Sequence, residues 1–355
     1  MTPLTKILRE KIEKHGALSV HDYMEAALSH PEYGYYTRQN PFGKSGDFVT
    51  APEISQMFGE LIGLWCIDTW SKLGEPAQFN LMELGPGNGT LLADALRSGA
   101  LVPEFIDAAH IHLVETSDRL RIRQKAALSH PSIFWYSDIP DLDNGPTIII
   151  ANEFFDALPI HQYEATAGKW YERFIDWKDD QFAFSVDTVS HKTLPPPSDA
   201  DSNLILEICP QGIKCLNSIS QSLQKFGGAA LIIDYGSANA IYGDSFQAVR
   251  DHTIQNPLVD PGMSDLTAHV KFPQLISEAR KYPVDIHGPT SQGRFLERLG
   301  IEARAALLKR SATEEQRKTI TSSLRRLTSA AEMGTLFKVL AISSGLTAPP
   351  EGFDL

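Results

Sequence analysis

A strand, a turn and a helix can be read directly from Phe79-Asn-Leu-Met-Glu-Leu-Gly-Pro-Gly-Asn-Gly-Thr-Leu-Leu-Ala-Asp-Ala-Leu-Arg97. The first residues form a short apolar run, as expected of a buried parallel strand, and the leucines after the turn recur at helical spacing. Gly85, Gly87 and Gly89 separate the two elements. Glycine permits a positive φ and lets a ligand approach the backbone, because it has no Cβ. This segment therefore predicts a glycine turn that binds a ligand.

The spacing of the turn and the acid before it indicate the kind of ligand. A dinucleotide-binding turn has the pattern GxGxxG and receives a pyrophosphate at the helix N-terminus. This turn is GxGxG and has no lysine, which disfavours a phosphate. Glu83 would place a carboxylate near the ligand, which favours a cation. S-adenosylmethionine, with its sulfonium and ammonium groups, fits the turn. The alternative is a tight turn that binds nothing.

Bulk properties exclude several classes of protein. The chain has 355 residues and a formal net charge of -12, which argues against a nucleic acid held by a broad positive surface. Its three cysteines lack CxxC spacing, so we expect neither a disulfide framework nor a metal site. No window approaches ~18 consecutive apolar residues, and the N-terminus does not resemble a signal peptide. We expect no membrane insertion and a bacterial cytoplasmic location, with the mitochondrial matrix as the alternative.

Two acids follow the next predicted strands and complete a cofactor site. Glu115 ends the apolar run 110–115. At the carboxyl end of a strand, an acid can accept hydrogen bonds from both hydroxyls of a ribose. Asp138 lies at the exit of the short strand in 134–140 and is a candidate partner for an adenine amino group. For each acid, the alternative is an exposed carboxylate at a strand end.

The acceptor of a methyl group is expected at the next strand end. The run 146–151 predicts a buried strand, and it leads directly into Asn152, Glu153 and Asp156. In a doubly wound sheet this strand lies beside the glycine strand, so both strand ends meet at one edge. These three side chains are therefore predicted to hold the methyl acceptor.

Two loops add further candidates. The segment 30–56 is rich in glycine, proline and aromatic residues, and it forms either a packed cover or an active-site lid. Asp47 and Glu53 give it more polar chemistry than a cover requires. The segment 237–272 is loop-like and contains His269, a candidate proton relay. A lone histidine is more often structural, but a second histidine in this loop favours function.

The order of the predicted elements defines a fold class and domains. We expect an α/β fold with a doubly wound sheet that is mostly parallel and whose last strand is antiparallel. Glu83-Leu-Gly-Pro-Gly-Asn-Gly89 resembles the first motif of class I methyltransferases, and this resemblance implies a fold of the class I methyltransferase type. Residues 1–75 would form N-terminal helices and the lid, and residues 76–355 the core. Alternating aromatic residues predict an antiparallel β insertion at about 160–208. Further insertions are expected at about 237–272 and 293–330, and the many arginines and lysines of the latter predict a solvated helical face.

Seven strings in combination resemble the MidA family. They are Tyr33-Gly-Tyr-Tyr36, Gly46-Asp-Phe-Val-Thr-Ala-Pro-Glu-Ile-Ser-Gln56, Phe58-Gly-Glu-Leu-Ile-Gly63, Glu83-Leu-Gly-Pro-Gly-Asn-Gly89, Asn152-Glu-Phe-Phe-Asp-Ala-Leu-Pro159, Ile233-Asp-Tyr-Gly236 and Asp265-Leu-Thr-Ala-His-Val270. The family includes the mitochondrial arginine methyltransferase that assists assembly of respiratory complex I. The resemblance implies S-adenosylmethionine as cofactor, an exposed arginine on a core subunit of complex I as acceptor, and symmetric dimethylarginine as product.

An arginine acceptor sets requirements on the site. Carboxylates should grip the guanidinium in bidentate fashion and leave one nitrogen nucleophilic. We expect Glu153 and Asp156, with Asp47 or Glu53, to form this clamp, and His269 to relay the released proton. Two rivals stay open: a small-molecule N- or O-methyltransferase, and a non-catalytic assembly factor that binds the cofactor only for stability. The sequence does not set the oligomeric state and leaves a homodimer open.

Overall fold

The computed structural model describes residues 1–38, 50–142, 144–191, 194, 197, 204–250 and 252–354. The chain divides into two compact units. The first unit comprises Met1–Phe48, Asp156–Lys214 and Asn239–Lys271. The second comprises Val49–Phe155, Cys215–Ala238 and Phe272–Leu355. Neither unit is continuous in sequence, so segments far apart in the chain build each of them.

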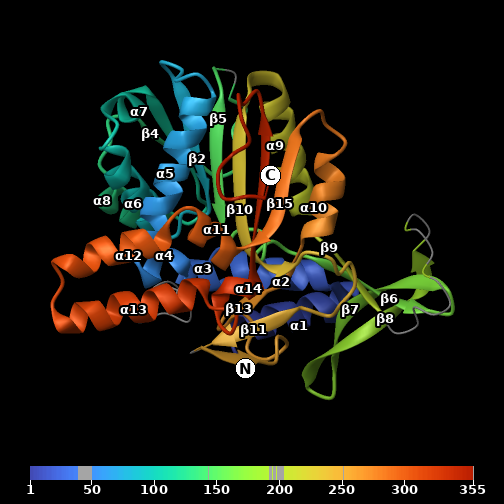
Figure 1. The fold of residues 1–355 in the computed structure, drawn as a ribbon. Helices are drawn as coiled ribbons and strands as arrows, with labels where there is room; N and C mark the ends of the chain where they lie inside the picture. Colours follow the sequence, from blue (N-terminus) through green and yellow to red (C-terminus); the bar gives the residue numbers. More distant parts are fainter. Residues whose placement is uncertain are drawn as a thin grey trace. The chain divides into compact units, whose positions relative to one another are not determined.

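A mixed β-sheet forms the centre of the second unit (Figure 1). The strand order is β15-β16-β10-β5-β2-β3-β4, and β10, β5, β2, β3 and β4 run parallel. The last strand in sequence, β16, runs antiparallel to both of its neighbours, as predicted. The strands are β2 (Phe79–Leu84), β3 (Ala109–Val114), β4 (Ile133–Tyr136), β5 (Thr147–Asn152), β10 (Gly228–Ser237), β15 (Asp285–Ser291) and β16 (Phe337–Ser344).

Helices lie on both sides of this sheet. α5 (Gln56–Lys72) and α6 (Thr90–Gly99) lie on one side, and α9 (Pro210–Phe226) and α10 (Phe272–Ala279) lie on the other (Figure 1). The other helices of the unit are α4 (Ala51–Ile54), α7 (Pro103–Ala108), α8 (Asp118–Ala127), α11 (Gln292–Arg298), α12 (Ile301–Arg310), α13 (Glu314–Thr328) and α14 (Met333–Leu336). Across the described residues, every helix is too short or too polar to cross a bilayer.

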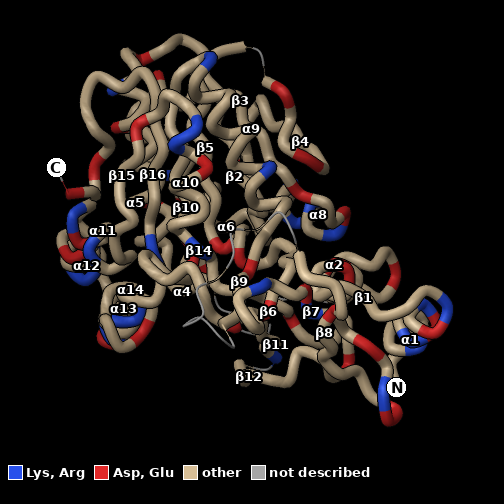
Figure 2. Tube along the Cα trace, turned by 90° about the vertical axis from the view of Figure 1, so that its right-hand side faces the viewer, with Lys and Arg blue, Asp and Glu red and all other residues tan. Residues whose placement is uncertain are grey.

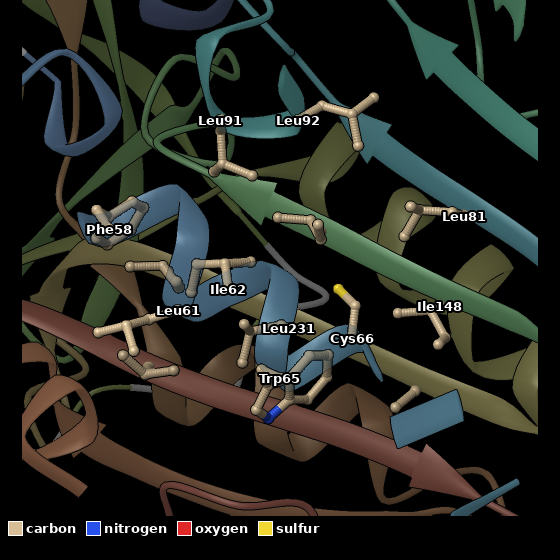
Figure 3. Packing of buried hydrophobic residues seen from close by; sticks show 14 of the residues in the cluster. Phe58, Leu61, Ile62, Trp65, Cys66, Leu81, Leu91, Leu92, Ile148 and Leu231 are labelled. Atoms are coloured by element: carbon tan, nitrogen blue, oxygen red, sulfur yellow. The ribbon is translucent and has the colours of Figure 1, made fainter. Parts of the chain in front are cut away.

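The main hydrophobic core lies between α5 and the sheet (Figure 3). Alternate residues of the strands point to this side, among them Leu81, Ile148 and Leu231. They pack with Ile62 and Trp65 of α5, and each of these five side chains is at most 2% exposed. Because parallel strands covered on both faces need apolar residues nearly throughout, the short apolar runs were sufficient to identify them.

α5 and α6 approach each other so closely that only glycine fits at two points. A Cβ added to Gly59 would lie 2.6 Å from the Cβ of Asp94, and one added to Gly63 would lie 2.6 Å from the carbonyl oxygen of Ala95. Real Cβ atoms do not tolerate such contacts. The close contact fixes α6, and therefore the glycine turn before it, against α5.

Within its described residues, the first unit combines two small antiparallel sheets with three helices. One sheet has the order β1-β7-β6-β9 with β8 paired to β7, and the other has the order β12-β11-β13. The elements are α1 (Pro3–His15), β1 (Leu18–Ser19), α2 (Val20–Ser29), α3 (Tyr35–Arg38), β6 (His161–Thr166), β7 (Lys169–Lys178), β8 (Gln181–His191), β9 (Ile205–Ile208), β11 (Gln247–Arg250), β12 (Thr253–Gln255), β13 (Asp265–Thr267) and β14 (Val270–Lys271). In the described part of 160–208, the consecutive strands β6, β7 and β8 pair as antiparallel hairpins, and β9 pairs antiparallel with β6.

The loop predicted for 237–272 is wrong in part, because this segment contains β11, β12 and β13. β11 pairs antiparallel with both of the others. All three strands are three or four residues long, and every residue of β12 is exposed. Strands this short show no alternation of apolar and polar residues, so periodicity does not detect them.

Lysines and arginines recur along α12 and α13 (Figure 2), but their side chains only partly form the solvated face that the sequence predicts. Lys318 pairs with Glu314, and both side chains are more than three-quarters exposed. Arg304, in contrast, donates from Nε and Nη2 to both carboxylate oxygens of Glu60 on α5, at 2.8 and 3.1 Å. The Glu60 side chain is only 7% exposed. Arg304 therefore anchors α12 to α5, a role that charge patterning alone does not reveal.

Candidate functional site

The predicted glycine turn joins β2 to α6. Gly85, Gly87 and Gly89 have φ angles of 62°, 53° and 80°, in the left-handed region that favours glycine. The Gly85 nitrogen donates to the carbonyl oxygen of Val114 at the end of β3. A Cβ on Gly85 would lie 2.9 Å from Cδ2 of Phe154, which follows β5. The turn is therefore held between the carboxyl ends of the two neighbouring strands.

A carboxylate from α4 binds the side of this turn. Oε1 of Glu53 accepts hydrogen bonds from Nδ2 of Asn88 at 3.1 Å and from Oγ1 of Thr90 at 2.7 Å. Nη1 of Arg123 donates to Oδ1 of Asn88 from the other side, at 3.1 Å. Glu53, predicted for the acceptor clamp, thus contacts the residues of the cofactor turn.

Gln124 of α8 connects the turn to the end of β3. Its side chain is fully buried. Nε2 donates to the carbonyl oxygen of Gly87 at 2.8 Å and to Oε2 of Glu115 at 3.2 Å. Oε1 accepts from Nε1 of Trp135 on β4 at 3.0 Å. Gln124 is not among the site residues predicted from the sequence, although a glutamine at a helical position that is otherwise apolar is a detectable signal.

Glu115 follows β3, where the ribose-binding acid is predicted. Its Oε1 accepts from the backbone nitrogen of Ser117 at 2.8 Å, and its Oε2 accepts from Gln124. Burial raises the pKa of Glu115, while the hydrogen bonds from Ser117 and Gln124 act in the opposite direction. Each carboxylate oxygen has more than one acceptor site, so both can still accept a hydroxyl group.

Glu83 and Asp138 differ sharply in environment. Glu83 is 3% exposed, and its Oε2 has no hydrogen-bond partner among the described residues. Burial raises the pKa of Glu83 to about 8. A buried carboxylate without a partner is suited to a cationic ligand, which would supply the missing counter-charge. Asp138 is exposed just after β4, and its Oδ1 accepts from the backbone nitrogen of Ile139 at 2.8 Å.

The end of β5 carries the residues predicted for the acceptor. Glu153 has a φ of 50°, which is unusual for a residue with a side chain and is a conformation often found at functional sites. Its Oε1 accepts from the backbone nitrogen of Ala51 at 3.0 Å and from Nδ2 of Asn152 at 3.2 Å. Oδ1 of Asn152 is buried and has no partner within the described ranges. α4 is thus bonded to the β5 end through Ala51 and to the glycine turn through Glu53.

In the first unit, the carboxylates of Asp265 and Asp156 influence the hydroxyl group of Tyr36. This hydroxyl group donates a hydrogen bond to Oδ1 of Asp265 at 3.0 Å. Burial first, and then the charges of Asp265 and Asp156, raise the pKa of Tyr36. Both aspartates are 6% exposed.

The backbone nitrogen of His269 donates to Oγ of Ser245 at 2.9 Å. Asp47, the remaining predicted acceptor residue, lies outside the described residues.

The residues of the second unit fit the cofactor predicted from the sequence. The glycine turn has no Cβ atoms at three positions to block a ligand, and Glu83 offers a buried carboxylate oxygen that no described residue pairs with. Glu115 offers hydroxyl groups a carboxylate that is held in place by hydrogen bonds. All three lie at the carboxyl ends of adjacent parallel strands, where ligands bind in folds of this kind. This chemistry matches the ammonium, sulfonium and ribose groups of S-adenosylmethionine.

Comparison with known proteins gives the same result. Residues 61–290 match a family model described as S-adenosyl-L-methionine-dependent methyltransferase. The chain is 35% identical to the protein arginine methyltransferase NDUFAF7 homolog, mitochondrial, of Drosophila melanogaster, over 97% of this chain and 86% of that protein. It is 33% identical to protein arginine methyltransferase NDUFAF7, mitochondrial, of Homo sapiens, over 96% and 83%.

A solved structure agrees with these matches. A protein of Burkholderia thailandensis, crystallised bound to S-adenosyl-homocysteine, superposes with a TM-score of 0.85 at 26% identity, covering 98% of this chain and 93% of that one. Its likeness shows that the mixed α/β architecture is a methyltransferase fold. The chain therefore belongs to the family of S-adenosylmethionine-dependent methyltransferases, and S-adenosylmethionine is its cofactor.

Proposed function

We propose that this methyltransferase acts on an arginine side chain of a partner protein. The observation that carries the proposal is the likeness to the Drosophila and human relatives, which are both named protein arginine methyltransferases. The alignment runs along most of both chains, so it includes the segments predicted to bind the acceptor as well as the cofactor turn. A likeness confined to the cofactor turn would not favour any particular acceptor.

The carboxylates around the end of β5 support an arginine acceptor. A guanidinium is bound most strongly by carboxylates that accept two parallel N–H bonds. In the proposed clamp, Glu153 and Asp156 grip the guanidinium, with Asp47 or Glu53 as a further acid. Oδ1 of Asn152, buried and lacking a partner in the described part of the chain, would accept one additional N–H. Because Glu53 already holds the glycine turn, its contribution would be mainly to positioning.

Positioning and charge localisation are what these residues would contribute to the reaction. S-adenosylmethionine supplies an electrophilic methyl group when it is bound. The carboxylates would draw the positive charge of the guanidinium toward two of its nitrogens and leave the third nucleophilic. Holding that nitrogen in a fixed direction would supply much of the rate increase. In this proposal His269 accepts the proton that the methylated nitrogen releases. For the cofactor, Glu83, the glycine turn, Glu115 and Asp138 are the proposed binding residues.

The domain roles are part of the same proposal. Residues 1–75 would provide the N-terminal helices and a lid over the active site, and residues 76–355 would provide the catalytic core. The hairpins at about 160–208 would form a β-rich subdomain inserted in that core.

With the family resemblance, the proposed partner is a core subunit of respiratory complex I and the proposed product is symmetric dimethylarginine. The relatives are named mitochondrial, whereas a bacterial cytoplasmic location stays a prediction for this chain.

The test is transfer of a labelled methyl group to a defined protein. The purified chain is incubated with S-adenosylmethionine carrying a labelled methyl group and with recombinant core subunits of complex I. The labelled protein is hydrolysed, and its amino acids are compared with methylarginine standards. We expect label in symmetric dimethylarginine. Gly87→Val should abolish labelling together with cofactor binding, because a side chain at a φ of 53° distorts the turn.

Glu153→Gln separates the acceptor side from the cofactor side. It should reduce labelling by about a hundredfold or more while S-adenosyl-homocysteine still binds, because only the clamp loses a charge. Glu278→Gln is the matched control, since it also removes one carboxylate, but from an ion pair at the end of α10 between Glu278 and Lys281, whose side chain is 61% exposed. Label in another amino acid, or only in small molecules, would refute the arginine proposal. A stable partner complex without any label would instead identify an assembly factor.

A further inference from the structure

Gln124 occupies a position that helical spacing assigns to the core. Leu120, Gln124 and Leu128 follow each other at intervals of four residues, and the two leucines are 4% and 8% exposed. Gln124 itself is completely buried. An amide at such a position is costly unless its hydrogen bonds are made, because the group has lost its contacts with water. A leucine would avoid this cost, so the amide must be explained by its contacts.

The three hydrogen bonds of Gln124 fix the orientation of its amide. The indole nitrogen of Trp135 can only donate, so the atom that faces it must be the amide oxygen. Both hydrogens of Nε2 are then used, one on the carbonyl oxygen of Gly87 and one on Oε2 of Glu115. A flipped amide would place a donor against the indole and leave two acceptors without donors. The orientation is thus determined by chemistry.

These contacts join three strand ends that are distant in sequence. Gly87 belongs to the turn after β2, Glu115 follows β3, and Trp135 lies on β4. The bond to Gly87 holds the turn at a positive φ, and the bond to Glu115 limits rotation of its carboxylate. Gly89 is also adjacent, since a Cβ added there would lie 3.5 Å from Gln124. One side chain therefore sets the spacing between the glycine turn and the acid.

We propose that Gln124 is a positioning residue that sets the selectivity of the cofactor site for an intact ribose. It would do so by presenting the Glu115 carboxylate to the ribose hydroxyls at a fixed distance from the glycine turn. The inference rests on the proposed role of Glu115 and is independent of the methyl acceptor. Gln124 itself does not contact the ligand in this account.

The test compares two ligands rather than one. S-adenosyl-homocysteine and its analogue lacking the ribose 2′-hydroxyl are titrated into the purified protein by calorimetry. In the parent protein the analogue should bind at least about tenfold more weakly, because a hydrogen bond to a charged group is lost. In Gln124→Leu, S-adenosyl-homocysteine should bind about tenfold more weakly, and the ratio between the two ligands should fall below about threefold.

A matched control exists in the same unit. Gln292 is also fully buried, and its Nε2 donates to the carbonyl oxygen of Leu327. Gln292→Leu should therefore cause a comparable loss of a buried hydrogen bond while leaving the ligand ratio unchanged. Trp135→Phe provides a milder variant, because it removes the donor that orients the Gln124 oxygen and leaves the other two contacts in place. It should reduce the ratio to an intermediate value even where Gln124→Leu folds poorly.

Two results would overturn the inference. The first is a parent-like ligand ratio in Trp135→Phe and in folded Gln124→Leu. The second is a parent protein that binds both ligands equally, which would also remove Glu115 from ribose recognition. Neither result bears on arginine methylation, since no acceptor is present in the titration. Conversely, transfer of label to an acceptor other than arginine would leave this inference intact.

Discussion

Replacing Gly85 with alanine should damage the cofactor turn in two separable ways. A φ of 62° costs a residue with a Cβ about 1–2 kcal/mol relative to glycine. In addition, the new Cβ would lie 2.9 Å from Cδ2 of Phe154, so the ring or the turn must move. Overpacking of this kind typically costs about 1–3 kcal/mol. The sum for Gly85→Ala is a loss of about 2–5 kcal/mol in the free energy of unfolding.

Gly74→Ala isolates the backbone contribution. Gly74 has a φ of 84°, and a Cβ there meets nothing within 4 Å. Urea denaturation should therefore show a loss of only about 1–2 kcal/mol for Gly74→Ala. S-adenosyl-homocysteine should bind to Gly74→Ala with parent affinity. It should bind to Gly85→Ala at least about tenfold more weakly, which corresponds to a loss of about 1.4 kcal/mol in binding free energy when the turn is displaced.

The contact with Phe154 can be tested by a double-mutant cycle. If the clash is real, Phe154→Ala should cost less in the Gly85→Ala background than in the parent, with a coupling free energy of about 1 kcal/mol or more. A Gly85→Ala variant that is as stable as Gly74→Ala and binds S-adenosyl-homocysteine with parent affinity would refute the clash with Phe154. Such a result would mean that the turn adapts to a side chain without cost.

Further predictions concern three charged groups. Burial raises the folded-state pKa of Glu83 from 4.5 to about 8, so this group's contribution to stability is full below pH 4.5 and is lost as pH rises through 8. Urea denaturation without cofactor measures the free energy of unfolding at pH 5 and at pH 8.5. Between these pH values the parent protein should lose about 4 kcal/mol more of this free energy than Glu83→Gln does. Parallel pH profiles of the two proteins would contradict this prediction. Glu53→Ala should weaken the binding of S-adenosyl-homocysteine by about tenfold in calorimetry, because the hydrogen bonds from Asn88 and Thr90 to Glu53 are lost. Unchanged binding would show that Glu53 does not position the glycine turn. Lys271→Met should lower the free energy of unfolding by about 3–5 kcal/mol, because the Glu207 side chain is 2% exposed and loses its ion pair. In thermal denaturation, adding Glu207→Gln should restore part of this loss. A loss below about 1 kcal/mol would show that the ion pair is not needed for stability.

Local patterns predicted the elements that surround the glycine turn. The apolar runs at β2, β3, β5 and β10 correspond to buried parallel strands, because a strand covered on both faces must be apolar nearly throughout. The three glycines adopt the positive φ angles that the turn requires. Patterns failed where elements are too short to show a period, as in β11 to β13. The assignments of individual cofactor and acceptor residues stay predictions.

The sequence by itself determined the strand, glycine turn and helix, and with them the kind of cofactor, because backbone conformation and burial follow from neighbouring residues. Only the tertiary structure decided which side chains hold that turn. Glu53 binds Asn88 and Thr90 across more than thirty positions, and Gln124 reaches Gly87 across a similar distance. Such partners are set by how α4, α6 and α8 pack against the sheet. Hydrogen bonds between distant segments depend on that packing, and no local period in the sequence encodes it.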